Sequence, residues 1–116
     1  ISAVELHHRI TGGNSLAVVD VRSAPEYENF HIQNSINIPV HELRERFTEL
    51  DKKADIALLC GSGQRASIGC SLLKQRGFEK IYNVAGGMAG YTAAGYGPEC
   101  PVCVLPWAPF SNQKIQ

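Results

Sequence analysis

The sequence has no excess of either charge, since 11 Lys and Arg residues balance 11 Asp and Glu residues over 116 positions. A protein that binds nucleic acid or an anionic membrane surface through charge needs clustered positive residues, so neither is expected as a partner. The sequence also lacks any apolar run that approaches the roughly 20 residues of a membrane-spanning helix. Its length and its hydrophobic fraction of 44% indicate one folded globular domain.

Cysteine is scarce, and the four residues of this type are Cys60, Cys70, Cys100 and Cys103. They are too few and too unevenly spaced for a disulfide scaffold, and a chain of this length can bury a core without one. We therefore expect free thiols in a reducing compartment, and a cytoplasmic location. Whether the chain is part of a longer protein stays open at this point.

Apolar runs of strand length alternate along the chain with segments of helical spacing. Strands are predicted at residues 16–21, 36–38, 56–60 and 81–84, and helices within residues 2–12, 23–30, 41–50, 65–76 and 87–94. The strand segments are nearly continuous in apolar residues, which is typical of parallel strands covered on both faces. Short connections between alternating strands and helices predict a compact α/β domain with a largely parallel sheet.

The sequence changes character from Gly97 onward. Four prolines follow at positions 98, 101, 106 and 109, and no helical or strand periodicity accompanies them. We therefore divide the chain into a domain of residues 1–99 and a C-terminal tail of residues 100–116 that contains proline and cysteine.

Cys60 stands where a buried strand is expected to end, and the loop Gly61-Ser62-Gly63-Gln64 leads from it to Arg65 at the start of a helix. Ligands of open α/β sheets gather at the carboxyl ends of the strands. The backbone N–H groups of such a loop, the positive end of the helix and the Arg65 guanidinium all favour an anion. The pattern therefore predicts a nucleophilic Cys60 thiolate in an anion-binding loop, in preference to a cysteine that only ends a strand.

Six short segments that contain polar residues or glycine are spread along the chain. In order they are Asp20-Val21-Arg22, Glu26-Tyr27, His31-Ile32, Ile36-Asn37-Ile38-Pro39, the loop from Cys60 to Ser67, and Ala85-Gly86-Gly87 with Tyr91, Gly95 and Pro98. Each segment alone is a weak signal, but together they resemble the rhodanese-like sulfurtransferase family over residues 1–99. The resemblance implies a rhodanese-like α/β fold, with a central five-stranded, mostly parallel sheet flanked by helices on both faces.

The resemblance also implies that Cys60 is the catalytic residue of a sulfurtransferase. Its thiolate would take the outer sulfur of a donor (thiosulfate, a polysulfide or a persulfide) and hold it as a persulfide. Cyanide or a thiol, including one on a protein acceptor, would then remove that sulfur. Backbone amides of residues 61–65 would bind the substrate and stabilise the anionic persulfide, and Arg65 would position the donor's oxyanion. No metal or organic cofactor is needed for this chemistry.

The length of the loop separates this branch of the family from related ones. Four residues lie between Cys60 and Arg65, whereas related phosphatase and arsenate-reductase domains have one more, which makes room for a tetrahedral group. The sequence therefore resembles the sulfur-transferring branch. Relatives that use thiosulfate well often carry a basic residue where this chain has Gly61, so a polysulfide or a protein persulfide is favoured as the donor.

Polar residues near the expected site have structural interpretations. Asp20 and Arg22 end a buried strand, and we expect them to support the neighbouring loops by hydrogen bonds and an ion pair, with Glu26 as a candidate partner. Asn34 stands where the family usually has glycine, and asparagine tolerates the left-handed conformation that such a turn needs.

The remaining cysteines allow several interpretations. Cys70 lies on the inward face of its expected helix and is interpreted as a small core residue. Cys100 and Cys103 form a Cys-Pro-Val-Cys motif, which could accept the transferred sulfur, supply half of a metal site or have no function. The apolar residues 102–110 are expected to pack on the domain, on a second copy or on a further domain.

A rival interpretation belongs to another functional class. A catalytically weak rhodanese-like domain can serve as a binding or regulatory module, such as one cut from a larger fusion protein. Relatives of that kind usually lose the cysteine or distort the loop. This sequence retains both Cys60 and Arg65, which favours an enzyme of the thiosulfate:cyanide sulfurtransferase class.

Overall fold

A parallel sheet forms the centre of the protein, whose computed structural model describes residues 1–13 and 15–96. Its strands are β1 (Leu16–Asp20), β2 (Ile36–Asn37), β3 (Asp55–Leu59) and β4 (Ile81–Asn83), in the order β2-β1-β3-β4 with all neighbours parallel. The predicted α/β class is confirmed, but the expectation of five strands is wrong for the described residues. Their apolar runs supply four strands, and the fifth was implied by the resemblance alone.

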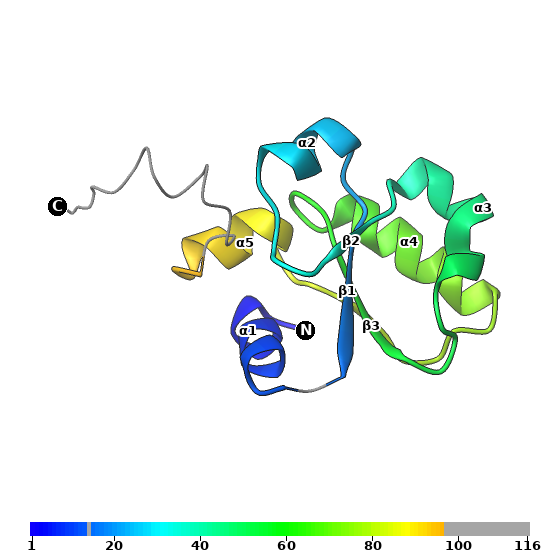
Figure 1. Ribbon diagram of the computed structural model, residues 1–116, viewed down its shortest axis with the longest axis horizontal. Coiled ribbons are helices and arrows are strands. Elements are labelled where there is room, and N and C mark those ends of the chain that lie inside the picture. The colour runs from blue at the N-terminus through cyan, green and yellow to red at the C-terminus, as the bar shows by residue number, and fades with distance from the viewer. Residues whose placement is uncertain (14, 97–116) are drawn as a thin grey trace, which may run out of the picture.

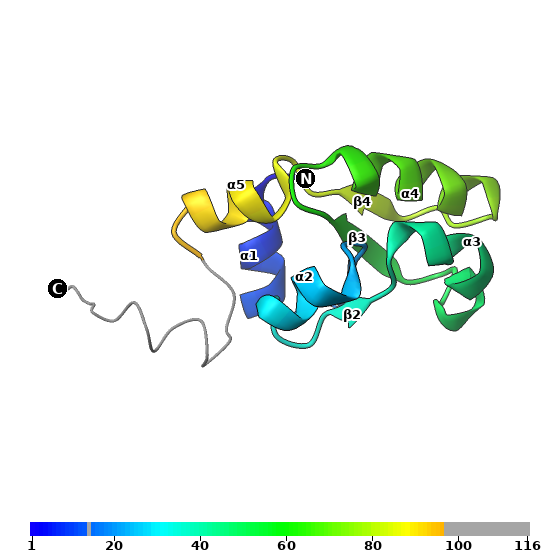
Figure 2. The same ribbon diagram turned by 90° about the horizontal axis from the view of Figure 1, so that it is seen from above.

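Helices cover both faces of this sheet (Figures 1 and 2). One face carries α1 (Ala3–Thr11) and α5 (Gly87–Ala93), and the other carries α3 (Leu43–Arg46) and α4 (Gln64–Gln75). α2 (Ala24–Asn29) follows β1 and lies beyond its carboxyl end (Figure 1). Among the described residues, no helix is long and apolar enough to cross a bilayer.

The helix expected at residues 41–50 is divided into three short pieces. The 3-10 helices η1 (Val40–Glu42) and η2 (Phe47–Glu49) flank the single α-helical turn of α3. Neither end of α3 has a side-chain cap, and each passes directly into a 3-10 turn. Leu43 is nevertheless fully buried, so this irregular segment still places its expected apolar face on the sheet.

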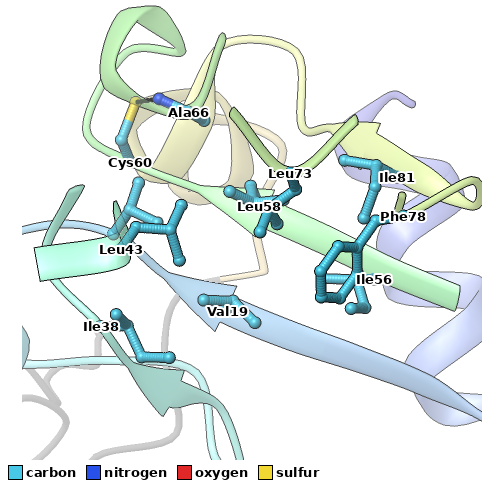
Figure 3. Packing of buried hydrophobic residues seen from close by; sticks show 11 residues of the cluster. Val19, Ile38, Leu43, Ile56, Leu58, Cys60, Ala66, Leu73, Phe78 and Ile81 are labelled. Atoms are coloured by element: carbon cyan, nitrogen blue, oxygen red, sulfur yellow. Dashed lines mark hydrogen bonds between the residues drawn. The ribbon is translucent and has the colours of Figure 1, made fainter. Parts of the chain in front are cut away.

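Side chains of β1 and β3 alternate between the two faces of the sheet, and both sets are apolar. Val19, Ile56 and Leu58 pack with α3 and α4 in the cluster that Figure 3 shows. Val18 and Leu59 pack with α1 and α5 on the opposite face. Successive strand residues point to opposite sides, so a sheet covered on both faces explains why these strands read as continuous apolar runs.

The local signals at the helix ends and turns are confirmed. Ser2 Oγ accepts a hydrogen bond from the N–H three residues later, and Ser23 and Glu26 form a complete capping box at α2. Gly77 follows α4 with φ of 95°, and Asn34 adopts φ of 70° in its turn. The left-handed turn at Asn34 therefore survives without glycine, because the short amide side chain tolerates it.

We predict that Leu58→Ala lowers the free energy of unfolding by about 2–5 kcal/mol, because it leaves a cavity in a closely packed layer. Leu58 is fully buried, and a methyl group added at Gly69 of α4 would lie 2.7 Å from Leu58 Cδ2. Urea denaturation measures the effect. The matched control is Ile68→Ala on α4, where the side chain is 65% exposed and the change should stay within about 0.5 kcal/mol. Equal losses in the two variants would contradict this packing.

Candidate active site

The candidate site lies where the strand order reverses. β2 is the neighbour of β1 on one edge, and β3 is the neighbour of β1 on its opposite edge. Open α/β sheets have a crevice at such a point, outside the carboxyl ends of the strands. Asp20 ends β1 opposite Leu59 of β3, and Cys60 follows directly. The two strand-end residues singled out in the sequence therefore meet at this edge.

The loop after β3 folds around the sulfur of Cys60. Cys60 is 1% exposed, and its Sγ accepts hydrogen bonds from the N–H groups of Gly63 at 2.9 Å and Ala66 at 3.3 Å. Figure 3 shows the contact to Ala66. Gly63 is the N-cap of α4 and has φ of 110°, a conformation that favours glycine. The sulfur thus lies at the positive end of α4, where an anion is stabilised.

The other loop residues lie outside this sulfur contact. The structure places Ser62 and Gln64 at the surface and leaves Gly61 partly exposed. The φ angle of Gly61 is not in the left-handed region, and a methyl group there would meet the Arg65 guanidinium at 3.1 Å. The loop therefore brings together Cys60, Gly63 and the first turn of α4, while its tip faces solvent.

The N-terminus of α5 fixes the loop from the opposite side. The N–H groups of Met88 and Ala89 donate to the carbonyl oxygens of Cys60 at 2.6 Å and Gly61 at 3.0 Å. Gly87 has φ of 59°, and a methyl group on it would overlap the Cys60 carbonyl oxygen and lie 2.8 Å from the Gly61 carbonyl carbon and oxygen. Only glycine at this position allows the backbone of α5 to approach the loop so closely.

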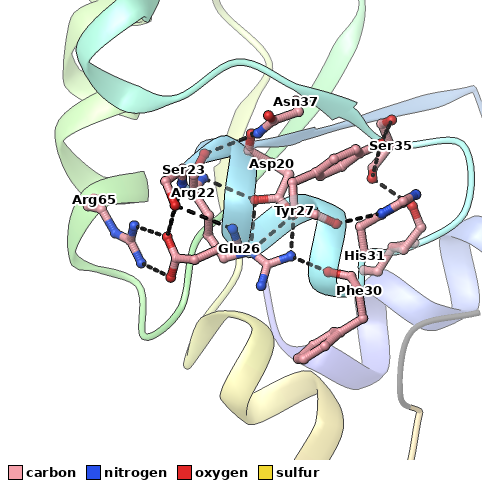
Figure 4. Close-up of polar contacts among 11 residues, drawn as sticks. Asp20, Arg22, Ser23, Glu26, Tyr27, Phe30, His31, Ser35, Asn37 and Arg65 are labelled. Carbon is pink, nitrogen blue, oxygen red and sulfur yellow. Dashed lines mark hydrogen bonds and ion pairs between the residues drawn. The ribbon is translucent and has the colours of Figure 1, made fainter. Parts of the chain in front are cut away.

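Arg65 is paired with Glu26 of α2. Its two terminal nitrogens donate to the two Glu26 carboxylate oxygens at 2.7 and 3.2 Å (Figure 4). The hydrogen bond from Arg65, helped by the N–H of Ser23, lowers the pKa of Glu26 from 4.5 to about 2. The same contact raises the pKa of Arg65. The expectation that Glu26 would pair with Arg22 is wrong, and the sequence analysis missed the pair with Arg65.

Arg22 instead forms a buried ion pair with Asp20. Its Nε and one terminal nitrogen donate to the Asp20 carboxylate, the shortest contact being 2.8 Å (Figure 4). The same terminal nitrogen donates to the carbonyl oxygen of Phe30 at 2.8 Å. Asn37 of β2 donates from its side-chain amide to the carbonyl oxygens of Asp20 and Arg22. These contacts connect the end of β1 to the end of α2 and to the edge strand.

Asn83 is a further residue that the sequence analysis missed. It ends β4, and its Nδ2 donates to the carbonyl oxygen of Gly63 at 3.3 Å. Its Oδ1 is buried and has no hydrogen-bond partner among the described residues. A polar side chain at the carboxyl end of a parallel strand is the signal that could have identified it. Asn83 thus binds the carbonyl oxygen of Gly63, the residue whose own N–H donates to the Cys60 sulfur.

An open groove of about 490 Å³ lies beside the loop. Its walls come from α2 and the turn before it on one side and from α5 on the other, and its lining residues are Arg22, Glu26, Phe30, Gly61, Met88, Ala89, Thr92 and Ala93. Apart from one arginine and one glutamate, these residues are uncharged and mostly apolar. The groove reaches the loop at Gly61, next to the buried cysteine.

Other predicted features lie away from this groove or outside the described residues. Cys70 is partly buried against the core, as interpreted, and burial raises the pKa of its thiol. Cys100, Cys103 and residues 102–110 lie outside the described residues. Within residues 1–13 and 15–96, no three His, Cys, Asp or Glu side chains gather as ligands for a metal ion.

Comparison with known proteins identifies the class of this domain. The sequence matches the family described as Rhodanese-like domain over residues 2–94, and the chain belongs to that family. It is 35% identical over 92 residues to YrkF of Bacillus subtilis, whose name describes a candidate sulfur carrier protein, with 79% of this chain and 50% of YrkF covered. The chain thus spans half the length of that relative.

The similarity to two further relatives extends over most of this chain and most of the relative. A protein named sulfurtransferase from Allochromatium vinosum is 27% identical over 95 residues, which are 82% of this chain and 89% of that protein. The crystal structure of a rhodanese-related protein from Thermoplasma volcanium superposes with a TM-score of 0.76 and 35% identity, covering 83% of this chain and 92% of the other. By their names, the three relatives are a sulfurtransferase, a rhodanese-related protein and a candidate sulfur carrier.

We predict that Gly87→Ala disrupts the loop around Cys60, because the added methyl group overlaps backbone atoms that cannot turn away. Overpacking of this kind costs about 1–3 kcal/mol, and changed amide chemical shifts at Gly63 and Ala66 report the loop itself. Gly90→Ala is the matched control on the same helix. Its methyl group would meet the Ala85 carbonyl oxygen at 3.1 Å and no atom of the cysteine loop, so the amide shifts of Gly63 and Ala66 should change less. A loop undisturbed by Gly87→Ala would contradict the close approach of α5.

We predict that the contribution of Glu26 to stability depends on pH. A carboxyl group with a lowered pKa stabilises the fold fully above its ordinary value of 4.5, and this contribution is lost as the pH falls toward about 2. The melting temperature of the wild type should therefore exceed that of Glu26→Gln at pH 6, and the difference should shrink between pH 4.5 and 2. Glu28→Gln, at an exposed position of the same helix, is the matched control. A difference that does not change with pH would contradict the ion pair with Arg65.

Proposed function

We propose that this protein is a sulfurtransferase that carries a sulfane sulfur on Cys60. The observation that supports the proposal is the pair of hydrogen bonds from the N–H groups of Gly63 and Ala66 to the Cys60 sulfur. Amides at a helix N-terminus stabilise an anionic sulfur, both as the attacking thiolate and as a terminal persulfide. Membership of the rhodanese-like family and relatives named as sulfurtransferases agree with this chemistry.

The proposed reaction has two steps. The Cys60 thiolate attacks the outer sulfur of a donor such as thiosulfate, a polysulfide or a persulfide. The sulfur–sulfur bond of the donor breaks, and the rest of the donor leaves with the electron pair as sulfite, a shorter polysulfide or a thiolate, while Cys60 becomes a persulfide. Cyanide or a thiolate then attacks the outer sulfur of that persulfide and regenerates the Cys60 thiolate. Donor and acceptor supply all atoms and electrons, so no cofactor takes part.

The surrounding residues have distinct proposed roles. The backbone of residues 61–65 binds the transferred sulfur. Arg65, which was expected from the sequence to position the donor's oxyanion, is proposed instead to hold the loop against α2, because both of its terminal nitrogens donate to Glu26. Asp20 and Arg22 support the crevice from the end of β1. We place this site in a domain of residues 1–99, followed by the tail of residues 100–116, and we expect it to act in a reducing compartment such as the cytoplasm.

A binding or regulatory module is the rival proposal. The chain retains the cysteine and the arginine of the loop, and the sulfur accepts hydrogen bonds from the loop and helix backbone. A module without chemistry has no need for this arrangement around a buried thiol. The geometry therefore favours the enzyme.

The proposal is tested by intact-mass measurement after brief incubation with thiosulfate or with polysulfide. The wild type should gain the mass of one sulfur atom, and cyanide should remove it. Cys60→Ser should gain nothing, because serine cannot form a persulfide. Cys70→Ser is the matched control and should load like the wild type, since burial raises the pKa of the Cys70 thiol and disfavours its reactive form.

Two outcomes would contradict the proposal. One is sulfur uptake by Cys60→Ser equal to that of the wild type, which would move the chemistry to another cysteine. The other is the absence of uptake from every donor by a wild type that is folded, which would favour the binding module.

A further inference from the structure

We infer that the donor is an organic persulfide, R–S–SH, whose carbon chain next to the sulfur is uncharged and lies in the groove between α2 and α5. The inference rests on the proposed function and specifies the class of its substrate. It depends on the charges and on the lining of this groove.

Both arginines near the groove are paired with carboxylates. Arg22 is buried and bound by Asp20, and its guanidinium also donates to the Phe30 carbonyl oxygen and lies over the Phe30 ring. Arg65 is bound through both terminal nitrogens to Glu26. Arg22 and Glu26 are the charged residues among those that line the groove. The four charges therefore cancel in two close pairs.

A dianion such as thiosulfate gains little from this arrangement. Binding thiosulfate requires stripping water from two negative charges, which is costly unless a cation or several donors compensate. An arginine that already faces a carboxylate cannot act as that cation without losing its partner. Gly61 contributes no charge at the point where the groove meets the loop. The site therefore offers stabilisation to the sulfur on Cys60 and little to a charged leaving group.

The walls of the groove fit a hydrocarbon chain. Phe30 on one side and Met88, Ala89 and Ala93 on the other present apolar surface beside Gly61. A groove of about 490 Å³ falls in the range of small-molecule sites, which are mostly apolar with a few polar groups. A carbon chain of a few atoms between these walls would direct its terminal sulfur toward the loop.

The sulfur transfer from such a donor balances without a further reactant. The Cys60 thiolate attacks the outer sulfur of R–S–SH, the bond between the two donor sulfurs breaks, and the inner sulfur leaves with the electron pair. The proton passes to this leaving thiolate, so R–SH departs and the Cys60 persulfide remains as the anion. No oxidant or reductant is needed, because the sulfane sulfur keeps its oxidation state and only moves from one thiol to another.

The test compares two donors on the same folded protein. N-acetylcysteamine persulfide is the uncharged probe and thiosulfate is the dianionic probe, and quenched-flow mass measurement gives the rate constant for loading Cys60. The rate constant for each donor is divided by the rate constant for the reaction of the same donor with a small thiolate in solution. We expect this normalised rate constant to be at least tenfold higher for the persulfide than for thiosulfate, so that their ratio is ten or more. A ratio of one, or one that favours thiosulfate, would overturn the inference and leave the proposed function standing.

Two matched variants test the cause of this preference. Ala89→Lys places a cation in the groove and should raise loading from thiosulfate at least tenfold, in a manner that salt suppresses, whereas Ala89→Leu should not. Phe30→Ala removes an apolar wall and should slow loading from the persulfide more than loading from thiosulfate. Unchanged thiosulfate loading in Ala89→Lys would overturn the charge argument. Loading from neither donor would reject the proposed function together with this inference.

Discussion

The close approach of α5 to the start of the loop is the constraint on which the candidate site depends. Two amides at the beginning of α5 bind the carbonyl oxygens of Cys60 and Gly61. With these carbonyls directed toward α5, the N–H groups of Gly63 and Ala66 converge on the cysteine sulfur from the other side. The contact is possible because Gly87 has no side chain to separate the two backbones. The positions of one helix and one glycine thus determine how the sulfur is bound.

The charged side chains around this centre have partners of their own. A buried guanidinium needs a carboxylate, because an unpaired charge in that position would be costly, and Asp20 supplies it to Arg22. Arg65 lies nearer the surface and joins the loop to α2 through Glu26. The two pairs order the crevice without leaving a net charge in it. Stabilisation of an anion is thereby concentrated on the backbone amides that point at sulfur.

The sequence predicted the features that depend on neighbouring residues. The caps at Ser2 and Ser23, the turn at Asn34 and the cysteine loop before α4 follow from local conformational preferences, and the structure contains them. The pairing of Arg65 with Glu26 was not predictable in this way, since 39 positions separate the two residues. For residues 1–13 and 15–96, four strands form where five were expected, because the number five came from the family resemblance and not from the apolar runs.

The long separation between interacting residues also has a consequence for folding. β1 pairs with β3, although about 40 positions of the sequence separate the paired residues. The carbonyl oxygens of Cys60 and Gly61 acquire their hydrogen bonds only when α5, which comes later in the chain, docks on the loop. Contacts between distant parts of a chain require loop closure before they contribute free energy, so they form slowly. During synthesis, the cysteine emerges before α5, the helix that completes its surroundings, because Cys60 comes earlier in the chain. Until α5 has folded back, the carbonyl oxygens of Cys60 and Gly61 lack these partners, so the complete surroundings of Cys60 exist only in the finished domain.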